Sequence, residues 1–184
     1  EGLGMDVQMA LPLATSSAVP FYEPSPALSL MARPGAIGIE TRRVAILVGV
    51  GVDAVLVGNL YDGLLQAGAV PRLVGSRLGK VVAADGSAMD VEISLEAGPS
   101  VMYDGVVIPD GIEAIKQQTR VMELLWDQYR QCKPMLVIGS GLQLLEAASI
   151  PLYLPNGDED ESIVIVQEDD DDFSRKHGAP GLNR

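Results

Sequence analysis

Gly139, Ser140 and Gly141 form a turn between a predicted strand and a predicted helix, the position at which a nucleophile elbow presents its serine. The elbow pattern G-x-S-x-G would need glycines where Ile138 and Leu142 stand, and no histidine lies near in the sequence. The glycines therefore predict a crowded strand-to-helix turn, with the serine capping the helix. We expect no catalytic residue on this scaffold.

A second candidate site is the turn after the first predicted strand. Gly49, Gly51 and Ala54 loosely match the G-x-G-x-x-G/A pattern, in which glycines let the backbone approach a pyrophosphate at a helix N-terminus. Arg77 follows the second predicted strand and could meet the 2′-phosphate of NADP. Glycines are also common in such turns for steric reasons alone. Steric relief is thus the favoured interpretation of these glycines, and an NADP-binding Rossmann-like module is the alternative. An FMN-binding loop would need several Ser or Thr hydroxyls in this turn, and the sequence VGVGVDA has none.

Few other residues offer chemistry. The only histidine, His177, stands in a polar tail, so we expect no Ser-His-Asp triad, no zinc site and no distal haem histidine. The single cysteine excludes a disulfide framework and a Cys-rich metal site. Cys132 falls on the apolar stripe of a long helix predicted over residues 112–132, which indicates packing.

The charge is uneven along the chain. Net charge is −12, but nine of the 25 acidic residues stand between positions 158 and 172. This local acidity argues against nucleic acid and anionic membranes as partners. The acidic run lacks the alternating pattern of a calcium-binding loop, so solvation is the favoured explanation. No apolar run is long enough for a membrane helix, and the compartment stays undetermined.

The chain divides into three predicted parts. Residues 1–42 hold five of the 12 prolines without periodicity, which predicts an extended, semi-rigid arm. Residues 43–168 form one domain, and residues 169–184 an acidic polar tail.

The predicted domain alternates strands and helices. Continuous apolar runs such as RRVAILV, from Arg43, indicate strands buried on both faces. A helix over residues 52–67 follows, with Val55, Leu56, Leu60, Leu64 and Leu65 at helical spacing, and two alternating runs within residues 79–94 surround Asp85-Gly86, a hairpin signal. The order predicts an α/β fold: a doubly wound, flavodoxin-like, mostly parallel sheet with helices on both faces and a β-hairpin insertion.

The combined pattern resembles the C-terminal domain of large-subunit (clade 2 type) catalases, which is similar to the class I glutamine amidotransferase-like superfamily. The resemblance is carried by EGLGM, SPALSL, RRVAIL and YRQCKPMLVIGSG, and most specifically by the block from Ser76 to Gly111. Enzymes of that superfamily place a cysteine at the elbow and an acid after the first strand. Gly139 and a position near Leu56 match these by place, so the resemblance implies a vestigial elbow at Gly139, Ser140 and Gly141.

The resemblance also implies a parent protein. An upstream domain, absent here, would hold haem and decompose hydrogen peroxide, and Met5–Arg42 would be the linker from it. This chain would hold no cofactor and would be catalytically inert, contributing stability and subunit packing to a homotetramer. The superfamily includes heat-shock chaperones, so unfolded client proteins are a further implied partner class.

The family usually closes with an amphipathic helix after the last strand. Here the end of the chain offers only Phe173 and Leu182 as large apolar residues, spaced too widely for a helix face. We therefore expect part of the sheet to stay uncovered.

Overall fold

The computed structural model of the chain describes residues 25, 27 and 38–166. The chain divides into two compact units, residues 1–37 and residues 38–184, and the first strand begins at Arg43. Most of the predicted arm, the predicted tail and His177 lie outside the described residues. The predicted domain boundaries therefore stay predictions.

Within residues 38–166, six strands form one sheet, and each neighbouring pair is parallel. Their order across the sheet is β5-β2-β1-β6-β7-β8. The strands are β1 (Arg43–Leu47), β2 (Val70–Gly75), β5 (Ile93–Ser94), β6 (Gly105–Ile108), β7 (Met135–Ile138) and β8 (Ile163–Val166). Without the two-residue β5 this is the 2-1-3-4-5 order of flavodoxin-like folds. The predicted fold class is confirmed.

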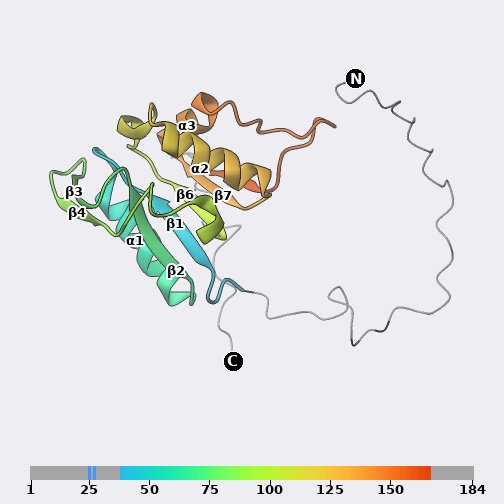
Figure 1. Cartoon of the computed structure of the whole chain (residues 1–184), viewed down its shortest axis with the longest axis horizontal. Helices are drawn as coiled ribbons and strands as arrows, with labels where there is room; N and C mark the ends of the chain where they lie inside the picture. The colour runs from blue at the N-terminus through green and yellow to red at the C-terminus, as the bar shows by residue number, and fades with distance from the viewer. Residues whose placement is uncertain (1–24, 26, 28–37, 167–184) are drawn as a thin grey trace, which may run out of the picture. The chain divides into compact units, whose positions relative to one another are not determined.

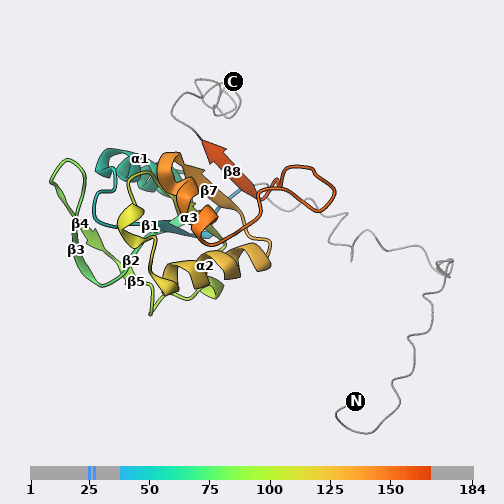
Figure 2. The same ribbon diagram turned by 90° about the horizontal axis from the view of Figure 1, so that it is seen from above.

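Three α-helices of the described region connect these strands: α1 (Ala54–Gln66), α2 (Thr119–Arg130) and α3 (Leu142–Ala147). Helix α1 connects β1 to β2, its neighbour toward the β5 edge of the sheet. Helices α2 and α3 connect β6 to β7 and β7 to β8, toward the opposite edge. Because such crossovers are right-handed, the two directions place helices on opposite faces. Figures 1 and 2 show α1 and α2 on opposite sides of the sheet, and α3 contacts α2.

The predicted hairpin is present as β3 (Gly79–Val82) and β4 (Ala88–Val91), which pair antiparallel (Figure 1). At its turn the Asp85 carboxylate accepts the Ser87 N–H at 2.8 Å, and Gly86 has a φ of 82°. Ile93 and Ser94, predicted as part of the hairpin, instead join the main sheet as β5. Glu92 causes this change, because its backbone N–H donates to the Leu73 carbonyl at 2.9 Å and draws the chain onto the sheet edge.

Helix α1 begins where Asp53 caps it, since the Asp53 carboxylate accepts the N–H groups of Val55 and Leu56 at 2.9 and 3.0 Å. Only Val57 of this helix is buried. Val55 and Leu65, predicted on its core stripe, are 66% and 57% exposed. The remaining members of that stripe, Leu56, Leu60 and Leu64, are half-buried. Helix α1 thus covers its face of the sheet incompletely.

The prediction of one long helix over residues 112–132 is wrong at both ends of this range. Its first part contains a 3₁₀ turn, η2 (Glu113–Ile115), and α2 starts only at Thr119. At the other end Cys132 takes a φ of 51° and is exposed. The N–H of Cys132 donates to the Tyr129 carbonyl at 2.9 Å, and the N–H of Lys133 to that of Gln128 at 3.0 Å. This arrangement ends a helix with a left-handed residue, so Cys132 turns away from the core.

Replacing Cys132 by glycine is expected to stabilise the domain by about 1 kcal/mol, because a left-handed φ strains any residue with a Cβ. Denaturant unfolding should show a higher midpoint with an unchanged m-value. Cys132→Ala is the matched control and should give no comparable gain, because alanine keeps the Cβ. Equal midpoints for the two variants would contradict the prediction.

Among the described residues, no helix has both the length and the apolar character that a membrane span requires. In the same part of the chain, no three His, Cys, Asp or Glu side chains are grouped so that they could hold a metal ion.

Candidate functional site

The turns after β1 and β6 meet at the carboxyl edge of the sheet, where the strand order reverses. Ligands of doubly wound folds bind at this point. The two turns are in close backbone contact here: a Cβ added to Gly111 would meet the carbonyl oxygen of Gly51 and would lie 3.2 Å from the Cα of Val52. Protein atoms therefore fill the space between the turns.

The predicted elbow lies beside the turn after β6. Gly139 has a φ of 54°, in the left-handed region, and a Cβ at this position would lie 2.7 Å from Oδ1 of Asp110. The Asp110 carboxylate accepts the Ser140 N–H at 2.8 Å, and the Ser140 hydroxyl oxygen accepts the Gly111 N–H at 3.0 Å. The turn after β7 thus contains a left-handed residue with a carboxylate directly beside it.

Ser140 does not cap α3, contrary to the prediction from the sequence. Gly141 is the N-cap residue of that helix, and no side chain caps it. The hydroxyl of Ser140 instead ties the elbow to the turn after β6. Sequence reasoning also missed Asp110. The sequence feature that could have identified Asp110 is the Pro109-Asp110-Gly111 turn, which directly follows a buried strand.

Asp110 carries a negative charge in this arrangement. Hydrogen bonding from Ser140, by its side chain and its backbone, lowers the pKa of Asp110 despite the opposing effect of partial burial. A thiol placed at the elbow would face this carboxylate. A neighbouring negative charge disfavours the thiolate, which is the reactive form of cysteine.

Gly139→Cys is therefore expected to create no hydrolase. The new side chain would contact Asp110 and force a residue with a Cβ into a left-handed φ, which costs about 1–2 kcal/mol. The measurement is hydrolysis of p-nitrophenyl esters, made in a Cys132→Ser background because the native thiol is exposed. Ester turnover above that of the Cys132→Ser chain would contradict this expectation.

Several backbone N–H groups at the turn with Gly49, Gly51 and Ala54 are already hydrogen-bonded within the protein. The Gly51 N–H donates to the Val82 carbonyl of the hairpin at 2.9 Å. The Asp53 carboxylate binds the first N–H groups of α1, where a phosphate would otherwise bind. A Cβ on Gly49 would lie 2.9 Å from Cγ2 of Ile115. These contacts favour steric relief as the reason for the glycines.

We therefore predict no binding of NADP, NAD or FMN at this turn. Arg77 is exposed on the loop between β2 and β3, and the hydrogen bonds and ion pairs found among the described residues do not join it to the turn. A ligand at 100 times its Kd would stabilise the chain by about 2.7 kcal/mol. Thermal melting with each nucleotide should show no such rise. A rise that is lost on Asp53→Arg or Arg77→Ala would restore the NADP alternative.

Among residues 38–166, the face of the sheet that carries α1 is only partly covered over β7 and β8, whereas Val107 of the neighbouring β6 is 4% exposed. In the parallel register Val107, Leu136 and Val164 point to one side; Leu136 is half-buried and Val164 is 39% exposed. Residues of the other side, under α2 and α3, are buried: Ala45, Leu47, Val106, Ile108, Met135, Val137 and Ile163. On the α1 face, burial is thus complete at Ile46 and Val107 but incomplete at Leu136 and Val164.

An apolar groove of about 320 Å³ lies on this partly covered face. Among the described residues no charged side chain lines it; those that do are Val44, Leu64, Gly105, Val106, Val107, Pro134, Met135, Leu136 and Val164. A helix is about 10 Å across and strands lie about 4.8 Å apart, so a single helix covers roughly two strands. Helix α1 cannot cover all six strands of this sheet. We call the groove and its lining residues the open sheet face.

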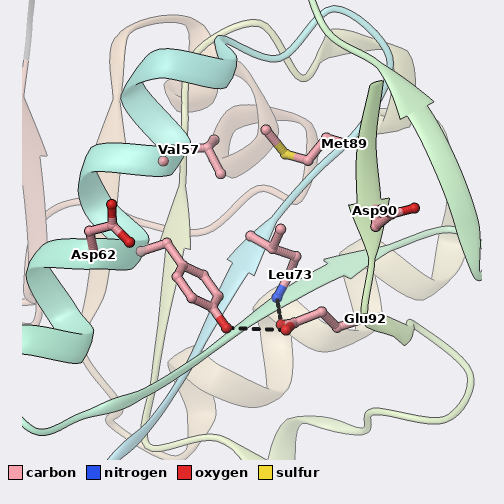
Figure 3. Close-up of a pocket in the computed structure, with 8 residues that line it drawn as sticks. Val57, Asp62, Leu73, Met89, Asp90 and Glu92 are labelled. Atoms are coloured by element: carbon pink, nitrogen blue, oxygen red, sulfur yellow. Dashed lines mark hydrogen bonds between the residues drawn. The ribbon is translucent and has the colours of Figure 1, made fainter. Parts of the chain in front are cut away.

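A second hollow, also of about 320 Å³, lies on the other side of α1, between that helix, β2 and the hairpin (Figure 3). Glu92 is fixed at its margin, because its carboxylate accepts the Leu73 N–H at 2.8 Å and the Tyr61 hydroxyl at 3.1 Å. Partial burial, together with Glu92, raises the pKa of Tyr61, so its phenol stays protonated. We call this hollow the Tyr61 pocket.

Comparison with known proteins points to one family. A family model for the C-terminal domain found in long catalases matches residues 40–171. Catalase HPII of Pseudomonas putida is 39% identical over 128 residues, which are 66% of this chain and 18% of that protein. Catalase C of Rhizobium meliloti is 33% identical over 138 residues, 73% of this chain and 19% of that protein. The chain thus spans about a fifth of the length of these curated relatives.

Solved structures with a similar fold include members of the DJ-1/ThiJ/PfpI group, which is glutamine amidotransferase-like. A two-domain protein of Anabaena variabilis with DJ-1/ThiJ/PfpI-like and ferritin-like domains has a TM-score of 0.58 at 23% identity, covering 62% of this chain and 34% of that chain. Oxidized DJ-1 of Toxoplasma gondii has a TM-score of 0.55 at 18% identity, covering 59% of this chain and 61% of that chain. These likenesses show the fold alone.

Proposed function

Because this chain belongs to the family of C-terminal domains found in long catalases, we propose that it is the non-catalytic domain of a large haem catalase and contributes stability and subunit packing. The parent would decompose hydrogen peroxide to water and oxygen with haem held in its upstream part. The partners of this domain would be that haem domain and the other subunits of a homotetramer.

The observation that carries this proposal is the open sheet face. A groove whose described lining is apolar, with Val44, Leu64 and Leu136 half-buried and Val164 exposed, loses little by desolvation when another apolar surface covers it. Burial of apolar surface stabilises by about 25 cal/mol per Å². Patches of this kind on a monomer usually mark interaction sites, and the haem domain or a neighbouring subunit is the partner that the family offers.

The test uses a catalase chain that carries this domain. Val164→Asp places a charge on the open sheet face at a residue that is already 39% exposed, and Val101→Asp is the control, at a 75% exposed valine on η1 (Ser100–Met102). We expect Val164→Asp to weaken the tetramer in analytical ultracentrifugation and to lower its melting temperature. Unchanged assembly and melting would contradict a packing role for this face.

We further propose that the chain has no peroxide chemistry of its own. Two of its tyrosines do not fit a haem-ligand role: Tyr61 donates its hydroxyl to Glu92, and Tyr103 is 2% exposed, with its hydroxyl against Gly98. Haem titration should leave no Soret band after gel filtration, and peroxide should not be consumed above buffer. A retained Soret band with oxygen release would overturn this part of the proposal.

A second candidate function is chaperone-like binding of unfolded clients by the isolated chain. The same open sheet face favours it, because an apolar groove that lacks its partner can bind exposed apolar segments of other proteins. The experiment that decides it is argued in the Discussion.

A further inference from the structure

Strand β8 forms one edge of the six-stranded sheet, since β7 is its only neighbour among the described strands (Figure 2). In this parallel ladder the Met135 N–H donates to the Ser162 carbonyl at 2.8 Å. Because Met135 stands opposite Ile163 in the register, the backbone groups of Val164 face β7. Those of Ile163 and Ile165 face outward, so β8 presents a row of backbone groups on its free side.

Three of these outward groups have no partner among residues 38–166. The Ile163 N–H donates to the Asp160 carbonyl at 2.9 Å. The carbonyls of Ile163 and Ile165, and the N–H of Ile165, take part in none of the hydrogen bonds found within the same residues. Backbone groups at a sheet edge bond to water or to a strand that adds to the edge. The edge thus has the donor and acceptors that an added strand needs.

The opposite edge of the sheet is blocked by its own residues. Pro71 has no N–H, and the Arg72 guanidinium donates to the Pro71 carbonyl at 3.0 Å. Glu92 occupies the Leu73 backbone, accepting its N–H at 2.8 Å and donating to its carbonyl at 2.9 Å. Proline and charged residues are the usual protection of edge strands. Strand β8, with the sequence IVIV, carries neither, and its β-branched residues favour strand pairing.

The charges around β8 select the kind of strand that this edge accepts. Four acids at positions 158–161 lead into β8, and the sequence after it holds five more at positions 168–172. The ion pairs found among the described residues involve other acids. A second copy of the chain, pairing antiparallel with β8, would place acids opposite acids, which is destabilising. A strand with basic residues on both sides has the complementary charge.

We propose that the outer edge of β8 binds an extended segment of a protein partner, one with lysine or arginine on both sides of a short apolar stretch. The segment would donate to the carbonyls of Ile163 and Ile165 and accept the Ile165 N–H. Main-chain hydrogen bonds would hold the segment, as in other cases of strand addition, and the acids would decide which segments are accepted. This inference concerns the edge of the sheet and does not rest on the packing role proposed for the open sheet face.

The test follows amide hydrogen exchange of the 184-residue chain by NMR. In the free chain the Ile165 amide should exchange fast, whereas the Val164 amide, which faces β7, should be protected. The peptide Lys-Lys-Val-Thr-Val-Thr-Lys-Lys at saturation should slow exchange at Ile165 about tenfold or more and leave Val164 unchanged. An Ile165 amide already protected in the free chain would show that the edge is occupied by the chain itself or by a second copy. That result, or the absence of saturable protection by the peptide, would overturn the proposal.

Two N-methylated forms of the peptide test the main-chain bonds. One carries N-methyl groups on its two valines and the other on its two threonines, so their composition and charge are the same. Alternate N–H groups of an added strand face its neighbour, so only one of the two forms loses the bonds to β8. That form should bind about tenfold more weakly than the other. Equal affinities would exclude the addition of a strand.

Charge variants test the selection by the acids. A peptide with glutamate in place of lysine should bind about tenfold more weakly or not at all. Glu159→Gln with Glu161→Gln removes two exposed acids before β8 and should weaken the lysine peptide about threefold or more. Glu96→Gln with Glu113→Gln removes two exposed acids elsewhere and should leave its affinity unchanged. Equal binding of the lysine and glutamate peptides would contradict a basic partner.

Discussion

Gly111→Ala is expected to destabilise the domain strongly and to lower its melting temperature by many degrees. Gly111 has a φ of 76°, which strains a residue with a Cβ by about 1–2 kcal/mol. The added methyl would meet the Gly51 carbonyl oxygen and would lie 3.1 Å from the Gly51 carbonyl carbon and 3.2 Å from the Cα of Val52. All of these are backbone atoms, which cannot rotate away as a flexible side chain can.

The backbone that opposes this methyl is firmly held. Val52 is 0% exposed, and the Gly51 N–H donates to the Val82 carbonyl at 2.9 Å. The total cost should exceed about 4 kcal/mol, a large part of the roughly 5–15 kcal/mol by which domains are stable. Circular dichroism and thermal melting give the measurement.

Gly58→Ala is the matched control in the same fold. It lies inside α1 with open space around the new methyl, so it should stabilise the helix by about 0.5–1 kcal/mol. If Gly111→Ala melted within a few degrees of the parent chain, the two turns at the carboxyl edge would not be packed as described.

The strands of the fold could be predicted because each is a local signal. The run VAILV, which begins in β1, and the run IVIV of β8 are apolar throughout and bounded by polar residues or glycine, which is typical of parallel strands. The hairpin also follows from local chemistry, because Asp85 and Gly86 favour the turn. Once the strand order is given, the right-handed connections place each helix on its face of the sheet.

Helix ends and helix faces were predicted less well because tertiary contacts decide them. The apolar spacing of residues 112–132 continues through a 3₁₀ turn, η2, that periodicity cannot distinguish from an α-helix. Helix α2 ends at a left-handed cysteine, Cys132, and not at the glycine that usually marks a helix end in the sequence. On α1, spacing favoured Val55 and Leu65, yet Val57 is the residue that the sheet buries.

In the candidate site, too, local sequence signals were predicted and tertiary contacts were not. Glycines at positions 49, 51 and 139 were recognised as a turn signal, and the structure shows which atom each added Cβ would meet. The role of Asp110 could not be predicted, because its partner Ser140 is 30 residues away. Likewise, Glu92 binds Tyr61 across 31 residues and Leu73 across 19. Hydrogen bonds between residues so far apart in the chain produce no periodic pattern in the sequence from which they could be predicted.

The isolated chain is expected to delay aggregation of a heat-unfolded enzyme without ATP. Unfolded clients expose apolar segments, and the open sheet face offers a groove of about 320 Å³ without charged residues in its lining. Apolar surface of this kind binds such segments non-specifically by the hydrophobic effect. The net charge of −12 would keep the complexes apart and soluble by like-charge repulsion.

Light scattering of a thermolabile enzyme at an equimolar ratio of chain measures this activity. Val164→Asp should abolish the delay, because the charge lies in the groove, while Val101→Asp adds the same charge at a 75% exposed site outside it and should keep the delay. Circular dichroism checks that both variants are folded. Absence of any delay, compared with an inert protein of similar charge, would exclude the chaperone-like function. A delay that survives Val164→Asp and is lost when residues 1–42 are deleted would place the activity in the arm, because the groove would then make no contribution to client binding.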